Sequence, residues 1–318
     1  MQFKNKMVLT TLAALLTACG GRGGSGSNNS GETNPPAIPS DVKQSEHLQL
    51  TVPTPNYDVN AENLASFNAI NKFRASLGLG LWAQNTKLDL AAQNHVEYEV
   101  LHKVFGHYET KGLAGFTGYD PNERAVYVGY APNWVGEVAV TGTGQEGIEA
   151  LINSVYHRSG LMNQEKSEVG IANSSDQLFP VQCVNFSNAK GSQNNSPDFI
   201  AVYPLNNQIN VPTFMILETP DPFPSLKFPG SPISFASVAG SKLKVISFTV
   251  TQQGFPMPLI TQLITQDNDP NPGHLPAHEA YISGVERFLP NTTYIVHFEG
   301  FIDAKPTKRD WSFTTGDQ

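Results

Sequence analysis

The feature that most limits the folds open to this chain is a change of sequence texture at the proline-rich stretch Thr219-Pro-Asp-Pro-Phe-Pro224. Before it, apolar residues recur at helical spacing in three segments. After it, only short strand-like runs are found, separated by Gly, Pro, Asn and Asp turns. These textures predict two domains, a first of mixed α and β structure and a second that is all β.

The first part of the chain predicts three helices and then a small sheet. Asn60 is a plausible N-cap for a helix over residues 60–77, and further helices are expected over residues 86–104 and 145–156. Strand-like runs follow at residues 169–172, 178–186 and 199–203. Helices followed by strands suggest a mixed layer fold.

The second part predicts one β-sandwich of about a hundred residues. Two of its segments, 289–298 and 311–315, resemble the last strands of bacterial Ig-like and fibronectin-like modules, and Tyr294 is placed to act as a tyrosine corner. The strands are expected at residues 232–238, 243–251, 259–265, 280–285, 293–298 and 311–315.

The N-terminus has the pattern of an export signal. Two lysines precede an apolar run over residues 7–16, which is far shorter than the roughly 20 residues of a membrane-spanning helix. The run ends in Leu16-Thr-Ala-Cys19-Gly20, which resembles the bacterial lipobox, so a lipid such as palmitate is expected on Cys19. Because Gly20 is not aspartate, resemblance to Gram-negative sorting favours the outer membrane. The alternative is an ordinary secretory signal with a chance cysteine.

Gly, Ser, Asn and Pro dominate the chain from there to residue 57, a composition that predicts a disordered tether. We therefore expect a membrane-anchored lipoprotein of the cell envelope. Its predicted parts are a signal peptide (1–18), the lipidated cysteine with a flexible linker (19–57), a first domain (58–205), a proline-rich linker (206–224) and an Ig-like sandwich (225–318).

Net charge and cysteine content limit which ligands, disulfides and catalytic groups are expected. The formal net charge is −8, and losing the two signal lysines makes the mature chain more acidic, which argues against nucleic acid as the ligand. Cys183 is the only cysteine besides Cys19, so no intramolecular disulfide is expected once Cys19 carries lipid. A lone cysteine in a strand most often behaves as a small buried hydrophobe, and a catalytic thiol is the less favoured interpretation.

Four stretches of the first domain together resemble the CAP (SCP-like) superfamily in its bacterial form. They are Leu88-Asp-Leu-Ala-Ala-Gln-Asn-His95, Phe105-Gly-His107-Tyr-Glu109, Val135-Gly-Glu137-Val and Ser154-Val-Tyr-His157-Arg158. The order and spacing of all four carry the resemblance, since none is specific alone. It implies a compact αβα sandwich with a cleft where two histidines and two acidic residues converge, a cleft that holds a divalent metal in some members.

Carried over by resemblance, the cleft residues are His107, Glu137 and His157. The family's second glutamate falls on Ser154, so it is missing at that position, and Glu109 is the expected substitute because it lies two residues from His107 on an extended segment. Two imidazoles and one or two carboxylates suit Zn²⁺, with an open position for water. The alternative is a buried hydrogen-bond network, with Arg158 or backbone groups as partners.

Three hypotheses for the function follow. The first is a binding module whose cleft takes a small apolar ligand, a cell-envelope ligand or a protein partner. The second is a metal-dependent hydrolase of peptide or cell-wall material using His107, Glu137 and His157, and the missing glutamate counts against it. The third is a structural envelope protein without a catalytic site. A serine hydrolase is disfavoured, because the chain has no Gly-x-Ser-x-Gly sequence.

Overall fold

The structure, a computed structural model, describes residues 47–132, 134–188 and 191–317. The predicted signal and Cys19 lie outside these residues. Contacts divide the chain into Met1–Asn34 and Pro35–Gln318, and every described residue belongs to the second unit. Within the described residues, no helix is both long enough and apolar enough to cross a membrane.

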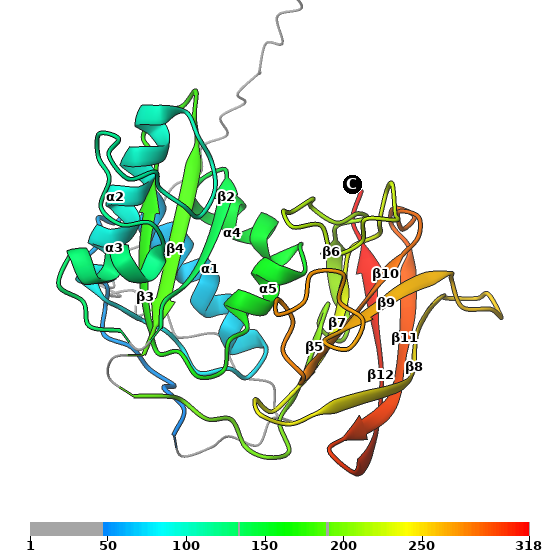
Figure 1. Ribbon diagram of the computed structural model, residues 1–318. Helices are drawn as coiled ribbons and strands as arrows, with labels where there is room; N and C mark the ends of the chain where they lie inside the picture. Colours follow the sequence, from blue (N-terminus) through cyan, green and yellow to red (C-terminus); the bar gives the residue numbers. More distant parts are fainter. Residues whose placement is uncertain (1–46, 133, 189–190, 318) are drawn as a thin grey trace, which may run out of the picture. The chain divides into compact units, whose positions relative to one another are not determined.

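A four-stranded sheet forms the centre of the first part of the chain (Figure 1). Its strand order is β1-β3-β4-β2, with β1 parallel to β3 and the other pairs antiparallel. β4 is buried along its whole length, as expected of an inner strand covered on both faces. The strands are β1 (Ala83–Gln84), β2 (Gly136–Thr141), β3 (Glu168–Asn173) and β4 (Val181–Ser187).

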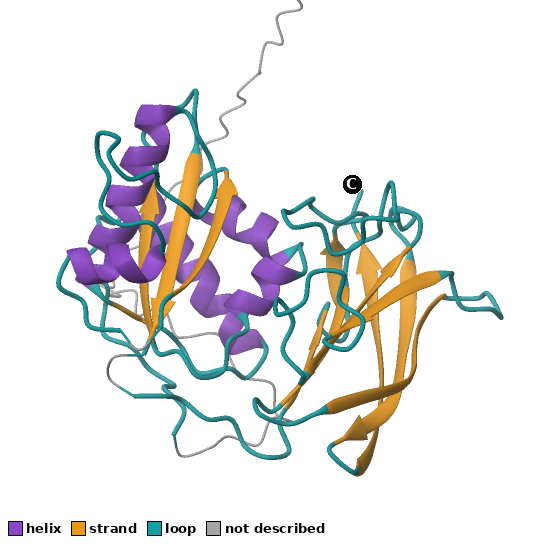
Figure 2. Ribbon diagram, in the orientation of Figure 1, coloured by secondary structure: helices purple, strands orange, loops and turns teal. Residues whose placement is uncertain are grey.

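Helices cover both faces of this sheet (Figure 2). Alternate side chains of β4 point to opposite faces. Val184 belongs to the apolar cluster that contains Phe67 and Ile148, whereas Cys183 packs with Val96 on the other face. α1 (Glu62–Ser76), α4 (Gly144–Ile152) and α5 (Tyr156–Leu161) contribute to the first cluster, and α2 (Thr86–His102) contributes to the second. The expected mixture of helices around a sheet is confirmed.

The position of α2 is fixed by its first turn and by a glycine. The Asn85 side chain caps the helix by accepting from the backbone N–H groups of Lys87 and Leu88. Gly170 of β3 lies against this turn, where an added Cβ would come within 2.0 Å of the Leu88 carbonyl carbon. Only glycine allows so close an approach. A further short helix that the sequence did not predict, α3 (Pro121–Tyr127), is capped by Asp120 and contacts α2.

Two more four-stranded sheets form the second part, in the orders β5-β7-β10-β9 and β6-β12-β11-β8. Side chains of both enter one apolar cluster, in which the rings of Phe235 and Phe298 stack with centroids 3.7 Å apart. The Tyr294 hydroxyl accepts from the Leu289 N–H at 2.8 Å, the hydrogen bond expected of a tyrosine corner. The strands are β5 (Ile200–Tyr203), β6 (Gln208–Val211), β7 (Ile233–Ser237), β8 (Leu243–Gln252), β9 (Thr261–Thr265), β10 (Glu279–Gly284), β11 (Thr293–Ile302) and β12 (Lys305–Thr315).

Two of these strands come from segments to which the sequence gave other roles. β5 was expected in the first domain but pairs with β7, and β6 lies in the predicted linker but pairs with β12. Strand-like patterns identify strands and not their partners, because pairing is decided by contacts far away in sequence. The second part of the fold therefore recruits residues from about 200 onward.

Buried polar contacts join the two parts of the chain, a point that the sequence left open. Asn153 donates to the Phe214 carbonyl at 2.8 Å, and Gln164 donates to the Ser237 carbonyl at 2.7 Å. Ala236 of β7 also belongs to the apolar cluster of α1 and α4. Residues of the second part can therefore help to form a site on the first.

Several predicted boundaries shift. α1 begins at Glu62 with Ala61 at the N-cap position, so Asn60 is not the cap. The helix expected over residues 145–156 is two helices, α4 and α5, with a break at residues 153–155. The tether was expected to reach residue 57, but Leu48 is buried and the Gln49 side chain donates to the Leu81 carbonyl at 3.0 Å. Folded structure thus begins before residue 57.

Candidate functional site

Two neighbouring cavities, together called the cleft, bring most of the predicted site residues to one place. The first has a volume of about 690 Å³ and the second of about 750 Å³. Glu137 lines the first and Glu218 the second. Five residues line both cavities: His107, His157, Thr219, Pro220 and His274.

Glu137, at the start of β2, is the centre of a buried polar network. Its Oε1 lies 2.9 Å from His107 Nδ1, and its Oε2 accepts from Arg124 at 2.7 Å. The Cys183 thiol donates to the same Oε2 at 3.1 Å. Arg124 also donates to the His107 carbonyl at 3.0 Å, so α3 holds both members of the His107–Glu137 pair.

The charges of this network follow from these contacts. Burial opposes ionisation of Glu137, but the attraction of Arg124 and the hydrogen bond from His107 outweigh it and lower the pKa to about 2. Glu137 is therefore a carboxylate, and His107 donates to it through Nδ1–H. Burial raises the pKa of the Cys183 thiol well above its usual value. Cys183 is thus a buried donor without the thiolate character that a nucleophile needs.

Glu109 does not take the role predicted for it. Its side chain is buried and does not line the cleft; instead it accepts from the Thr117 N–H at 2.7 Å and lies 3.0 Å from His95 Nδ1. The prediction failed because the chain bends at residues 106 and 107, so the strand alternation on which it rested does not hold there. Glu109 belongs to the support of the network and not to the cleft surface.

His95, on α2, is a charged part of that support. Its Nδ1 faces the Glu109 carboxylate, and its Nε2 lies 2.9 Å from the Gly106 carbonyl oxygen. A carbonyl only accepts, so the imidazole donates from Nε2, and a carboxylate at Nδ1 favours a proton there too. Burial opposes the charge, yet the hydrogen bond that His95 donates to Glu109 and the attraction of Glu137 raise the pKa of His95. We assign His95 as a buried imidazolium.

The acid that the sequence could not find for His157 is Glu218. Its Oε2 lies 2.8 Å from His157 Nδ1. The carboxylate also accepts from the backbone N–H groups of Val155, Tyr156 and His157, at 2.6 to 3.2 Å. Glu218 thus sits over the break between α4 and α5 and holds the His157 ring from behind. It comes from residues 61 positions further on, so no local spacing around His157 could have indicated it.

The His157–Glu218 pair does not form a serine triad. Ser154 Oγ lies 3.3 Å from His157 Nδ1, the nitrogen that already faces Glu218, and it donates to the Leu151 carbonyl at 2.9 Å. In a triad the serine and the acid occupy different ring nitrogens. Ser154, His157 and Glu218 therefore lack the arrangement that a serine triad needs.

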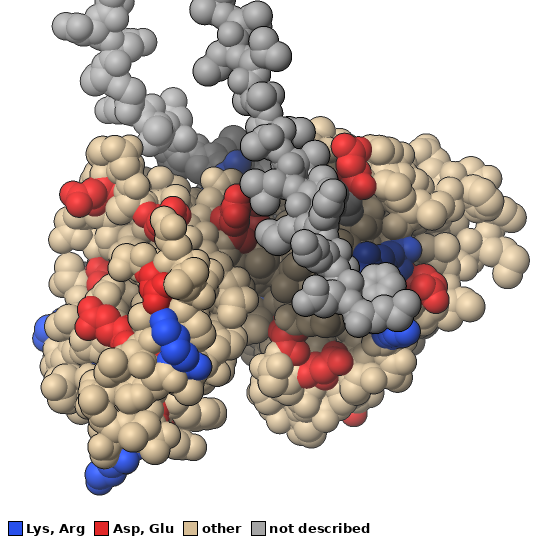
Figure 3. All heavy atoms as spheres, turned by 90° about the horizontal axis from the view of Figure 1, so that it is seen from above, with Lys and Arg blue, Asp and Glu red and all other residues tan. Residues whose placement is uncertain are grey.

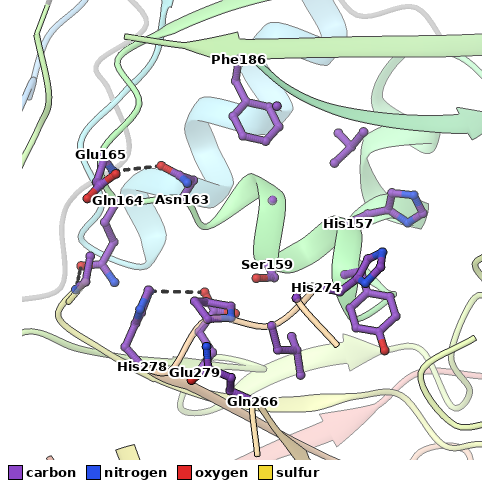
Figure 4. A pocket seen from close by; sticks show the side chains of 18 of the residues that line it. His157, Ser159, Asn163, Gln164, Glu165, Phe186, Gln266, His274, His278 and Glu279 are labelled. Atoms are coloured by element: carbon purple, nitrogen blue, oxygen red, sulfur yellow. Dashed lines mark hydrogen bonds and ion pairs between the residues drawn. The ribbon is translucent and has the colours of Figure 1, made fainter. Parts of the chain in front are cut away.

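A third histidine of the cleft, His274, was not predicted. It lies between β9 and β10, and its ring packs on Tyr156 with centroids 4.9 Å apart. His274 Nδ1 lies 2.9 Å from the Asn271 carbonyl, which can only accept, so Nδ1 carries the proton. Figure 4 shows His274 and His157 at the same end of the first cavity. A single histidine in a loop of the second part gives no pattern that would link it to His107.

The described residues do not fit the predicted zinc site. A catalytic zinc usually has three protein ligands. Glu137 is saturated by Arg124, His107 and Cys183, so it is not available as the third ligand beside His107 and His157. Across residues 47–132, 134–188 and 191–317, no group of three or more His, Cys, Asp or Glu side chains is arranged to hold a metal ion.

Arg158 is not the partner of the cleft carboxylates either. Its guanidinium donates to the Ile152 carbonyl at 2.6 Å and to the Pro232 carbonyl at 2.8 Å, and it lies over the ring of Tyr203. Its role is to join α5 to the second part of the chain. The network predicted as an alternative to a metal does exist around Glu137, but with Arg124 as its cation.

Away from His157 and His274, the first cavity carries another acidic group, Glu279 of β10, beside His278 (Figure 4). Its Oε1 lies 3.8 Å from His278 Nε2, and its Oε2 accepts from the Tyr281 hydroxyl at 2.8 Å. Burial raises the pKa of Glu279 to about 7, against the hydrogen bonds from Tyr281 and Ser159. Burial also lowers the pKa of His278 to about 4. Between about pH 4 and 7, Glu279 and His278 are therefore both mainly uncharged.

Comparison with solved structures finds matches of low identity. An extracellular protein containing a SCP domain from Bacillus anthracis shares 18% identity with a TM-score of 0.36, and the match covers 40% of this chain and 40% of that one. An outer surface protein from Borrelia burgdorferi also shares 18% identity with a TM-score of 0.36, over 41% of this chain and 95% of that one. A search of curated proteins found no match.

Comparison with family models gives a match that falls on the site just described. Residues 67–184 match the model of the cysteine-rich secretory protein family, CAP. This segment contains His107, Glu137 and His157 but ends before Glu218 and His274. Residues 67–184 of this chain are therefore a CAP domain, as the four motifs indicated.

Proposed function

We propose that this protein is an exported binding module, anchored to the cell envelope through Cys19, whose cleft takes an envelope ligand. The observation that carries the proposal is the pairing of His107 with Glu137 and of His157 with Glu218 along one cleft. In each pair the histidine Nδ1 is hydrogen-bonded to the glutamate, and the histidine Nε2 has no partner among the described residues. A largely apolar pocket with a few fixed polar groups is the usual form of a ligand site.

In both pairs the glutamate is buried, whereas the histidine is accessible to a ligand. The side chains of Glu137 and Glu218 are each 1% exposed, whereas those of His107 and His157 are 35% and 16% exposed. The carboxylates thus fix the rings from behind, and the rings present the accessible surface. The extracellular and outer-surface descriptions of the two similar structures are consistent with an exported protein.

Ligand binding can be tested on the unit Pro35–Gln318 by thermal melting with soluble envelope glycan fragments and with palmitate. A ligand that binds only the folded state raises the melting temperature in a concentration-dependent way. We expect such a rise for the native sequence and its loss in the His107→Ala/His157→Ala double variant. No rise with either probe would refute the binding proposal.

Anchoring can be tested separately by fractionation of cells that express the full chain. With Cys19→Ser we expect the protein to move from the membrane fraction to the soluble exported fraction, because the lipid on Cys19 is the proposed anchor. A Cys183→Ser variant is the matched control and should remain in the membrane fraction. Equal partitioning of the Cys19 variant and the native chain would exclude the lipid anchor.

A second candidate, a hydrolase that needs no metal, is favoured by one observation. His157, oriented by Glu218 through Nδ1, has the arrangement of a general base that takes a proton from water through Nε2. Hydrolysis of peptide or cell-wall substrates that is unaffected by chelators and lost in His157→Ala would support it. The binding proposal is preferred because no nucleophile is held beside that Nε2 among the described residues.

A further inference from the structure

The second part of the chain forms one wall of the cleft. His274, Gln266 and Glu279 line the first cavity together with the CAP-domain residues His107 and His157. His274 also lines the second cavity, so it stands where the two cavities meet. The sandwich is therefore part of the candidate site and more than a spacer.

Three imidazoles of the cleft share one hydrogen-bonding state. His107, His157 and His274 each direct Nδ1 to an acceptor, namely Glu137, Glu218 and the Asn271 carbonyl. No hydrogen bond joins their Nε2 atoms to another described residue. In the neutral imidazole the proton stays on Nδ1, so Nε2 carries a lone pair that accepts from a ligand O–H or N–H.

The charge around the cleft argues against an anionic ligand. Among the described residues, no lysine or arginine lines either cavity, whereas Glu137, Glu165, Glu218 and Glu279 do. On the face shown in Figure 3, acidic side chains are scattered among a few basic ones. Glu137 and Glu218 already accept from several protein donors, which also leaves them poorly placed to pair with a cation. A neutral ligand fits this lining best.

Exposed aromatic rings provide the apolar surface of the cleft. Trp134 is 47% exposed and lines the first cavity, and Phe105 and Tyr108, at 49% and 63%, line the second. Tyr108 is held in place by stacking on Tyr119, with centroids 4.9 Å apart. Flat apolar rings beside hydrogen-bond acceptors suit a molecule that has C–H faces and hydroxyl groups at its edges.

We propose that the ligand is an uncharged, hydroxyl-bearing glycan that spans both parts of the chain, with hydroxyl groups donating to His107, His157 and His274 and sugar faces on Trp134 and Tyr108. This inference rests on the proposed function, since it names the ligand class of the same cleft. It assigns to His274 a role in ligand recognition that lies outside the CAP domain.

The test is calorimetric titration of the unit Pro35–Gln318 with neutral chitotetraose, and in parallel with anionic oligogalacturonate and with palmitate. We expect chitotetraose to bind and oligogalacturonate not to bind. His274→Ala and Trp134→Ala should each weaken chitotetraose binding about tenfold, the effect of one lost contact. His297→Ala, on an exposed part of β11, is the matched control and should bind like the native sequence.

Three outcomes would overturn the inference in different ways. If palmitate binds in a His157-dependent manner and chitotetraose does not, the cleft is a ligand site of another class, and the proposed function stands without the glycan. If none of the three probes binds, the inference and the proposed function fail together. Tighter binding of oligogalacturonate than of chitotetraose would refute the assignment of a neutral ligand.

Discussion

Two buried glutamates line the same cavity but ionise in different pH ranges. Glu137 of β2 and Glu279 of β10 are each almost inaccessible. Glu137 faces the Arg124 guanidinium and has a pKa of about 2, whereas Glu279 faces Tyr281 and His278 and has a pKa of about 7. Burial favours the neutral acid in both, so the partners alone decide which of them ionises.

This difference in pKa gives the cavity one carboxylate that stays charged and one acid that titrates near neutrality. The Glu137 network positions His107 and stays ionised over the physiological range. Glu279 changes charge near neutrality, in a cavity that residues of both parts of the chain line.

The largest effect is expected from removing the cation of the Glu137 network. Arg124→Met leaves a buried carboxylate without its partner, and breaking a buried ion pair in this way costs about 3 to 5 kcal/mol. Denaturant unfolding at neutral pH measures the loss. Lys308→Met is the control, since Lys308 pairs with Glu299 on the surface and should cost about 0 to 1 kcal/mol. Equal effects of the two substitutions would contradict the buried charge.

Acid should remove the contribution that ionised Glu137 makes to the stability of the folded protein. Because its pKa is lowered from 4.5 to about 2, the stability that it adds is fully present above about pH 4.5 and is lost as the pH falls towards 2. The shift corresponds to about 3 kcal/mol. We expect the difference in unfolding free energy between the native sequence and Glu137→Gln to shrink over this range. A constant difference would show that Glu137 is not ionised in the native state.

The stability that depends on Glu279 should change with pH in the direction opposite to that of Glu137. Its folded-state pKa is raised from 4.5 to about 7, so the native state loses stability as the pH rises between these values. Glu279→Gln keeps a neutral acceptor for Tyr281 and removes the ionisation. We expect this variant to be more stable than the native sequence at pH 8, by about 3 kcal/mol, and equal to it at pH 4. A variant that is less stable at pH 8 would contradict the account of this end of the cavity.

A third buried acid, Glu218, can be compared with Glu137 and Glu279, because it is held by backbone N–H donors. Glu218→Ala leaves buried N–H groups of Val155 and Tyr156 without an acceptor, at a cost of about 1 to 3 kcal/mol. The His157 ring also loses its orientation, so ligand binding should fall along with stability. Glu218→Gln retains one acceptor oxygen and should fall between the native chain and the alanine variant. Unfolding and binding measured on both variants check this order.

The fold could largely be read from local patterns, because most elements bury one periodic face. α2 was predicted within two residues of its observed end, and each strand expected after residue 225 is present. The predictions failed for the pairing of two strands and for one short helix. The assignment of β5 and β6 to sheets depends on long-range pairing, and the short helix α3 begins with an Asp120-Pro121 cap in a segment without an apolar stripe.

The site was only partly predictable for a similar reason. His107, Glu137 and His157 came from motifs that lie close together in sequence, and all three line the cleft. Glu218 and His274 come from outside the matched CAP segment and reach the cleft only through tertiary structure. Glu109 was placed by strand alternation, which does not hold because the chain bends at residues 106 and 107.

The central claim is that the cleft presents histidine Nε2 lone pairs fixed by acceptors at Nδ1. Long-range ¹H–¹⁵N correlation spectra of histidine-labelled Pro35–Gln318 report directly which ring nitrogen carries the proton. At alkaline pH we predict the Nδ1–H tautomer for His107, His157 and His274, and at neutral pH we predict protons on both ring nitrogens of the buried His95. Nε2–H tautomers at His107 and His157 would contradict the account, because those rings could then offer a ligand only a donor.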